Sequence, residues 1–180
     1  MAIERVADRL RRSTAALESA GVPYAVIGGN AVAEWVGRVD EGAVRFTRDV
    51  DILLRRGDLP AAIEAMTAAG FEYHRTFEVD MFLDGPDGKP SEGVHVIFAG
   101  EKVKPDDAAP APDVDDSEAG KFRVIDLQRI VQMKLTSFRD KDRTHLRDMI
   151  GVGLIDQSWV DRYPSPLSDR LRQLLDDPDG

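Results

Sequence analysis

The sequence predicts an α/β protein of the α+β type, with a small mixed sheet flanked by helices and a helical C-terminal part. Two observations indicate this fold class. In the first hundred residues, short apolar runs and turn residues alternate with segments of helical spacing, and beyond residue 120 only helical spacing remains. The chain has 180 residues, 42% of them hydrophobic, which is enough apolar material for one core. We therefore expect a single domain over residues 1–180.

Composition and charge exclude several classes of function. The sequence has no cysteine and only three histidines, which excludes disulfide frameworks, thiolate metal centres and cysteine nucleophiles and argues against a histidine-rich metal site. The formal net charge of −9 opposes broad attachment to nucleic acid or to an anionic membrane. Charges run through the first ten residues and no apolar run could span a bilayer, so we expect a cytoplasmic protein without membrane contact.

The first expected element is an amphipathic helix over residues 3–20. Apolar residues recur there at helical spacing, and Gly21 and Pro23 end the pattern because a helix does not easily continue through them. Residues 23–27 form a short apolar run that is closed by glycines, which predicts a strand.

Two adjacent glycines separate this strand from a second helix over residues 31–36. Asn30 is the expected N-cap of that helix. Without a Cβ, Gly28 and Gly29 would let a phosphate approach the backbone N–H groups at the positive end of the helix dipole. On their own, two glycines are more simply a tight structural turn. The pair therefore indicates a phosphate site only in combination with the residues that follow.

Two aspartates alternate with apolar residues in the next strand, expected over residues 49–54 after a loop at 37–48. Side chains at i and i+2 leave the same face of a strand, so Asp49 and Asp51 are expected to project together while their apolar neighbours point into the core. A divalent cation between the carboxylates would relieve their repulsion, and oxygen ligands favour Mg²⁺ or Mn²⁺. An isolated Asp-x-Asp pair is better explained as part of the solvent-exposed face of an edge strand.

The rest of the chain completes the sheet and then becomes helical. Residues 104–120 are rich in Pro, Ala and Asp without an apolar period, so we expect a solvated loop between a sheet-containing core at 1–103 and C-terminal helices at 121–180. Asp126 is the expected N-cap of the first of these helices. The further expected elements are a helix at residues 61–69, strands at 71–75, 77–83 and 93–99, helices at 127–135 and 141–150, and a last helix that ends near Leu174.

The order of these motifs resembles the DNA polymerase β-like nucleotidyltransferase superfamily, in which a strand, a Gly-Gly or Gly-Ser turn and a helix precede Asp-x-Asp on the next strand. Residues 45–53, Arg-Phe-Thr-Arg-Asp-Val-Asp-Ile-Leu, are similar to the Arg-x-Thr-x-Asp-hydrophobic-Asp signature of its small bacterial members of the AbiEii-toxin type. Residues 133–142 and 146–148 resemble the helical Lys-Leu segment and the trailing acidic position of that family. The resemblance covers about residues 21–150.

The resemblance implies a nucleotidyltransferase-like fold and the transfer of a nucleoside monophosphate from an NTP to an acceptor. It implies Mg²⁺ or Mn²⁺ as cofactor, held by Asp49 and Asp51, and a contact between Lys134 and a phosphate. The nucleotide-binding residues that it implies are Gly28, Gly29, Asn30, Arg45, Thr47 and Lys134. Without the upstream signature, Lys134 would be an ordinary surface residue. The acceptor stays open, with RNA or a protein as candidates, and a cognate antitoxin is a candidate partner.

One position departs from the family pattern. The family usually supplies a third carboxylate from a later strand, and the best match here, Val94-His-Val96, places His95 where the acid is expected. Imidazole is a weaker partner for Mg²⁺ than carboxylate but is acceptable to Mn²⁺ or Zn²⁺. Three explanations compete: His95 is a general base, Asp80 or Asp148 supplies the acid, or the site binds a nucleotide without turnover. A purely structural hydrogen bond is an equal alternative for His95.

The C-terminal helices hold a local excess of positive charge that could bind a polyanionic acceptor such as RNA. The basic residues are Arg129, Lys134, Arg139, Lys141, Arg143 and Arg147. Aspartates interleave with them, so a solvated helix face is the simpler explanation. A catalytically degenerate nucleotide-binding module, or a toxin–antitoxin or regulatory protein that acts through a partner, is therefore the alternative to an enzyme.

Overall fold

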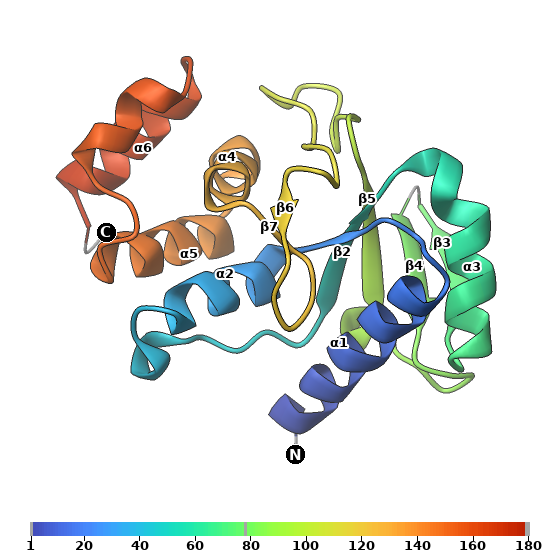
Figure 1. The fold of residues 1–180 in the computed structure, drawn as a ribbon. Coiled ribbons are helices and arrows are strands. Elements are labelled where there is room, and N and C mark those ends of the chain that lie inside the picture. The colour runs from blue at the N-terminus through green and yellow to red at the C-terminus, as the bar shows by residue number, and fades with distance from the viewer. Residues whose placement is uncertain (1, 78, 179–180) are drawn as a thin grey trace.

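A computed structural model describes residues 2–77 and 79–178 of the chain, and within this part seven strands form one mixed sheet (Figure 1). The strands are β1 (Ala25–Ile27), β2 (Val50–Leu54), β3 (Glu72–Thr76), β4 (Val79–Leu83), β5 (Val94–Phe98), β6 (Ser117–Glu118) and β7 (Val124–Ile125). Their order in the sheet is β3-β4-β5-β2-β1-β7-β6. β2 runs parallel to β5 and β1 parallel to β7, and the other neighbours are antiparallel.

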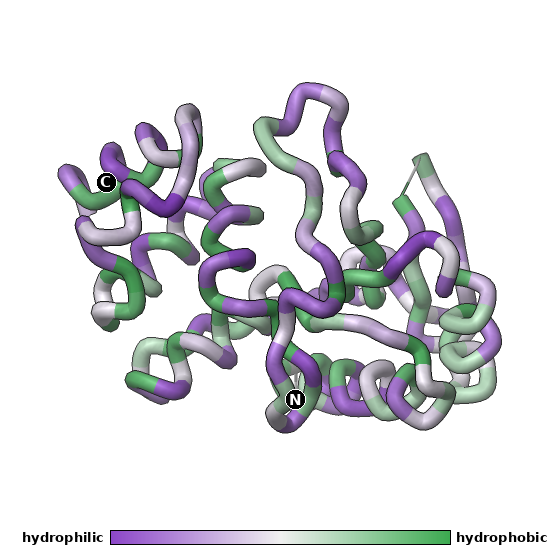
Figure 2. The backbone as a smooth tube through the Cα atoms, turned by 45° about the horizontal axis from the view of Figure 1, so that its top comes forward, coloured by the Kyte–Doolittle hydropathy of each residue, from purple (hydrophilic) through white to green (hydrophobic). Residues whose placement is uncertain are grey.

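Helices cover both faces of the sheet. They are α1 (Ala2–Ser19), α2 (Gly28–Gly37), α3 (Leu59–Ala68), α4 (Leu127–Ser137), α5 (Asp140–Gly151) and α6 (Leu167–Asp176). α1 and α3 lie on one face and α2, α4 and α5 on the other, with α6 against α4 and α5 (Figure 1). Hydrophobic and hydrophilic residues alternate along the helices, as expected where one side of each helix is covered (Figure 2). None of the described helices is long and apolar enough to cross a membrane.

The central strands separate two hydrophobic cores, one on each face. Val50 and Ile52 of β2 are fully buried in the core beneath α1 and α3. Ile27 and Leu53 belong to the core on the α2, α4 and α5 side. Burial stabilises each such side chain by about 1.5–3 kcal/mol, and successive strand residues point to opposite faces. The apolar residues of β2 therefore fix Asp51 on the α2 side of the sheet.

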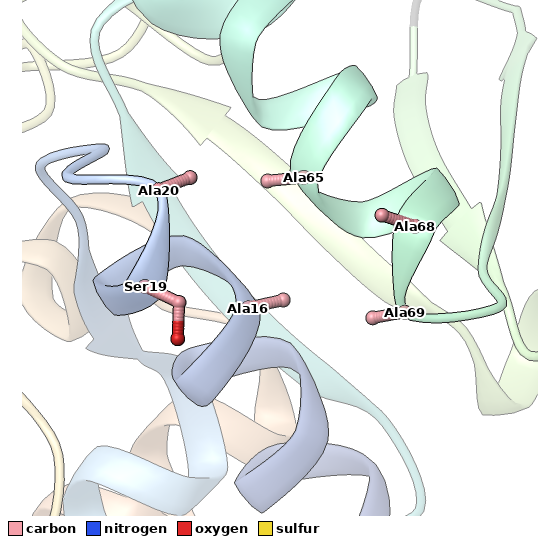
Figure 3. Close-up of a pocket in the computed structure, with 6 residues that line it drawn as sticks. All are labelled: Ala16, Ser19, Ala20, Ala65, Ala68 and Ala69. Carbon is pink, nitrogen blue, oxygen red and sulfur yellow. The ribbon is translucent and has the colours of Figure 1, made fainter.

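α1 and α3 meet through small side chains on the opposite face of the sheet from Asp51. A shallow hollow of about 320 Å³ lies between these helices (Figure 3). Its lining residues are Ala16, Ser19, Ala20, Ala65, Ala68 and Ala69. With methyl groups and one hydroxyl as its lining, the hollow offers no set of charged or chelating groups, and it reflects the close approach of two helices.

Most elements expected from the sequence lie within a few residues of their expected bounds. The expected strands that carry the Asp-x-Asp pair and the histidine are β2 and β5, and the three expected C-terminal helices are α4, α5 and α6. Of the strand expected at 77–83, Phe77 lies in a turn, residue 78 lies outside the described residues, and β4 forms the rest. Met1 and residues 179–180 of the expected domain also lie outside them.

Three local details differ from expectation. α2 begins at Gly28, so Asn30 lies in its first turn and the N-cap position falls on Ile27, whose backbone is extended. The loop expected at 104–120 contains β6, because a two-residue strand is too short to show a period of two. Asp126 does occupy the N-cap position of α4, but its side chain accepts no capping hydrogen bond.

α5 carries a histidine that the fold keeps neutral. The Nδ1 atom of His145 is buried and has no hydrogen-bond partner among the residues that the structure describes. Burial, together with the nearby positive charge of Lys134, lowers the pKa of His145 from 6.5 to about 4. Between these two values the unfolded chain binds a proton at this position and the folded chain does not.

We predict that this histidine makes the protein less stable as the pH falls from 6.5 to 4. The slope from one such group is at most about 1.4 kcal/mol per pH unit. His145→Gln should remove this part of the pH dependence, measured as the free energy of urea unfolding at several pH values. His74→Gln, at an exposed position of β3, controls for the loss of a histidine. An unchanged slope in the His145 variant would contradict the prediction.

Candidate metal and nucleotide site

Two aspartates and a histidine converge where β2 and β5 run side by side. Asp51 and His95 are direct partners in the parallel register, so their side chains leave the same face. Asp49 lies two residues before Asp51 and projects toward the same point. One possible ligand atom from each of the three residues lies within 4.8 Å of the other two. Among the residues that the structure describes, these three form the group that could hold a metal ion. The prediction that Asp49 and Asp51 project together is confirmed.

The edge-strand explanation of the aspartates is wrong. β2 lies between β5 and β1, so it is an interior strand of the sheet. The side chains of Asp49, Asp51 and His95 are 22%, 20% and 24% exposed, which leaves the cluster accessible from solvent but mostly covered by protein. Such partly covered carboxylates need positive charge or hydrogen-bond donors nearby to stay ionised.

The surroundings of the cluster supply those groups. Burial disfavours the ionised form of Asp49, but a hydrogen bond from the Thr47 hydroxyl and the positive charges of Lys141 and His95 bring its pKa below the ordinary value of 3.8. The carboxylate of Asp51 raises the pKa of His95, with smaller contributions from the Pro90 carbonyl and from Asp49. The site therefore favours the ionised form of Asp49, whose negative charge attracts a cation.

Gly28 is required by the position of Asp51. Its φ of +65° lies in the left-handed region, and a Cβ built on it would lie 2.0 Å from Oδ2 of Asp51. A Cβ on Gly29 would lie 3.0 Å from Cβ of Thr47. Both glycines therefore give room to residues of the site, and their contact with a triphosphate stays a prediction. The N-terminus of α2 lies at this point without a side-chain cap.

Two other residues expected to bind nucleotide hold Asp49 in place. The Thr47 hydroxyl donates a hydrogen bond to Oδ1 of Asp49, and Nδ2 of Asn30 donates to the Asp49 backbone carbonyl over 2.9 Å. Asn30 thereby ties the first turn of α2 to the start of β2. These bonds give Thr47 and Asn30 a positioning role that the sequence did not reveal, and direct contact with a nucleotide stays a prediction for both.

Neither alternative acid belongs to the described cluster. Asp148 of α5 pairs with Arg45, whose Nε lies 2.7 Å from Oδ2 of the carboxylate. Asp80 is paired in the sheet with Val96, the neighbour of His95, and therefore lies on the opposite face. It is 3% exposed and accepts a 2.5 Å hydrogen bond from the Tyr73 hydroxyl. The third group beside the aspartates is thus His95.

Lys134 lies in a buried ion pair, so the surface-residue explanation is wrong. It is 5% exposed, and its Nζ lies 2.9 Å from Oδ1 of the fully buried Asp142. Burial would raise the pKa of Asp142, but hydrogen bonds from Arg139, Lys134 and Ser137 lower it far below 3.8. The ammonium expected to contact phosphate therefore already has a partner, and the phosphate contact stays a prediction.

Two basic residues at the start of α5 lie within electrostatic reach of the aspartates. The pKa of Arg139 is raised first by its hydrogen bond to Asp142 and further by the charges of Asp51 and Asp49. Lys141 in turn lowers the pKa of Asp49. In the sequence, both residues were only members of the basic set in the C-terminal helices. Their nearness to the aspartates could not be predicted, because tertiary packing determines how α5 approaches the sheet.

The fold is similar to that of solved nucleotidyltransferases, although no protein-family model and no curated protein matches the sequence. An antigenic nucleotidyltransferase-like protein from Paracoccidioides brasiliensis is 20% identical with a TM-score of 0.55, over 96% of this chain and 90% of that chain. The antibiotic-resistance factor ANT(2'')-Ia is 16% identical. Its solution structure has a TM-score of 0.54, over 96% of this chain and 83% of that chain. Its crystal structure with adenylyl-2''-tobramycin has a TM-score of 0.50, over 94% of this chain and 86% of that chain. The chain has the nucleotidyltransferase fold that its motifs predicted.

We predict that Gly28→Ala destabilises the protein more than Gly21→Ala does. Gly21 has a φ of +66° and open space around its Cβ position, so both variants carry the left-handed penalty of about 1–2 kcal/mol. Only Gly28→Ala adds the collision with Asp51, at about 1–3 kcal/mol. Urea unfolding measures the difference, and equal losses would show that Asp51 does not need the missing Cβ.

We predict that Asp142→Asn lowers the free energy of unfolding at pH 7 by about 3–5 kcal/mol, because it leaves the buried Lys134 charge unpaired. Asp140→Asn, at a fully exposed position two residues earlier in the same helix, should cost less than about 1 kcal/mol. Because folding lowers the pKa of Asp142, its stabilisation is present above 3.8 and declines as the pH falls below that value. Similar losses in the two variants would contradict the buried pair.

Proposed function

We propose that the protein is a metal-dependent nucleotidyltransferase that moves a nucleoside monophosphate from an NTP to an acceptor. The observation that supports this most is the meeting of Asp49, Asp51 and His95 directly beside the N-terminus of α2, on a nucleotidyltransferase fold. A cluster that can hold a divalent cation and a helix N-terminus that favours phosphate are the two parts that phosphoryl transfer needs.

In the proposed reaction an acceptor oxygen forms a bond to the α-phosphorus of the NTP. The bond from that phosphorus to the bridging oxygen breaks, and pyrophosphate leaves with the electron pair. Mg²⁺ or Mn²⁺ bound by Asp49 and Asp51 would neutralise charge on the transferred group. His95, beside both carboxylates, completes the ligand set or accepts the proton of the acceptor hydroxyl.

The remaining residues would bind and orient the triphosphate. α2 begins at Gly28 and Gly29 without a side-chain cap, and the backbone N–H groups of these residues would meet the phosphate oxygens. Arg139 and Lys141 add positive charge close to the aspartates. We infer that Lys134 acts through Asp142, to which Arg139 also binds, and so positions Arg139 toward the site.

The finer assignment, to the AbiEii-toxin type with a cognate antitoxin as partner, rests on the Arg45-to-Asp51 signature. In that case the acceptor would be RNA or a protein, and the protein would work as one domain in the cytoplasm, where NTPs are available. ANT(2'')-Ia, whose crystal structure contains an adenylylated tobramycin, adds aminoglycosides to the acceptors that are worth testing. A nucleotide-binding module without turnover is the second candidate, and the replacement of the usual third acid by His95 favours it.

We predict that purified protein transfers label from an α-labelled NTP in the presence of Mn²⁺ or Mg²⁺ and one of these acceptors. Asp49→Asn and Asp51→Asn should each reduce transfer roughly 100-fold or more, because each removes a charge that acts on the reacting phosphate. Asp87→Asn, at an exposed turn position between β4 and β5, is the matched control and should retain activity.

Three results would separate the candidates. Transfer that depends on Asp49 and Asp51 supports the enzyme. Metal-dependent NTP binding without any product supports the binding module instead. If neither binding nor transfer occurs, or if both aspartate variants behave as the wild type does, the proposed function is refuted.

A further inference from the structure

The imidazole of His95 is held with one nitrogen directed toward the two carboxylates. Its Nε2 lies 2.7 Å from the backbone carbonyl oxygen of Pro90, in the segment that leads into β5. A carbonyl oxygen only accepts hydrogen bonds, so Nε2 is the nitrogen that carries the hydrogen. In the neutral ring the lone pair is then on Nδ1. A histidine that ligates a metal characteristically donates its other N–H to a backbone carbonyl or carboxylate in this way.

Nδ1 of His95 and the two carboxylates are spaced as ligands of one ion. Nδ1 lies 3.5 Å from Oδ1 of Asp51 and 3.9 Å from Oδ2 of Asp49, beyond the range of a good hydrogen bond. Around an octahedral ion with bonds of about 2.1 Å, neighbouring ligands lie about 3.0 Å apart and opposite ligands about 4.2 Å apart. The observed separations fall between these values. With all three ligand atoms within 4.8 Å of one another, the cluster is close to the spacing of ligands around a single cation.

We propose that Asp49, Asp51 and Nδ1 of His95 form a mixed oxygen and nitrogen site that selects a first-row transition ion, represented by Mn²⁺, over Mg²⁺. Mg²⁺ prefers oxygen ligands, whereas first-row transition ions accept imidazole alongside carboxylates. The inference concerns the site of the proposed function and rests on it for its role in catalysis. Ion binding itself is measurable without a nucleotide, an acceptor or turnover.

The coordinating nitrogen can be detected directly in the wild-type protein. Pulsed electron paramagnetic resonance of the Mn²⁺-loaded protein should show coupling to one histidine nitrogen, and ¹⁵N labelling of histidine should change that signal. His95→Ala should abolish the coupling and weaken Mn²⁺ binding at least about tenfold in calorimetry. His74→Ala, which removes an exposed histidine of the edge strand β3, two strands away from β5, should keep both.

Ion selectivity is tested by titrating wild type and His95→Asp with MnCl₂ and with MgCl₂. The wild type should bind Mn²⁺ more tightly, and His95→Asp should shift the ratio of the two dissociation constants toward Mg²⁺ by at least about tenfold, because carboxylate replaces imidazole. Since the nitrogen coupling is read from the wild type, a variant that fails to fold leaves that test intact.

The outcomes distinguish this inference from the proposed function. Nitrogen-coordinated Mn²⁺ with the expected selectivity supports the inference, even if no nucleotide transfer is found. Bound Mn²⁺ without nitrogen coupling, or equal affinity for Mn²⁺ and Mg²⁺ in the wild type, overturns it, even if the protein transfers nucleotide. Failure of the wild type to bind Mn²⁺ at this cluster overturns it as well.

Discussion

The parallel register between β2 and β5 is the constraint on which the site depends. It places Asp51 opposite His95, and it does so because the flanking pairs, Val50 with Val94 and Ile52 with Val96, enter the core beneath α1 and α3. A slip by one residue would expose these apolar side chains and turn the acid into the core. Hydrophobic burial on one face of the sheet thus keeps the charged groups together on the other face.

Clustered carboxylates repel each other, and the fold offsets this with local donors and positive charge. The Thr47 hydroxyl and Asn30 hold Asp49, and the imidazole of His95 faces both acids. On the helical side, the buried network around Asp142 ties Arg139 to Lys134, next to the left-handed Phe138 that ends α4. The turn between α4 and α5 brings the basic residues at the start of α5 toward the aspartates. Packing of the C-terminal helices therefore contributes to the charge balance of the site.

Local patterns predicted the parts of the site that lie close together in the chain. The two-residue alternation of side chains along a strand predicted that Asp49 and Asp51 project from the same face. The glycine turn lies next to them, as the order of the motifs suggested. What the sequence could not indicate depends on contacts between distant segments. Helix packing buries Lys134 against Asp142, and sheet pairing, which periodicity alone does not give, places His95 beside the acids at the position that the family resemblance had indicated. Side-chain periodicity carries no information about which strands become neighbours or which helix faces meet.

The most direct measurement is a crystal structure of the protein with Mn²⁺ and a nonhydrolysable NTP, with anomalous diffraction recorded near the manganese absorption edge. We expect an anomalous peak enclosed by Asp49, Asp51 and His95, with the triphosphate against the start of α2 at Gly28 and Gly29. A manganese peak away from these three side chains, or a nucleotide bound on another face of the sheet, would contradict the assignment of the site.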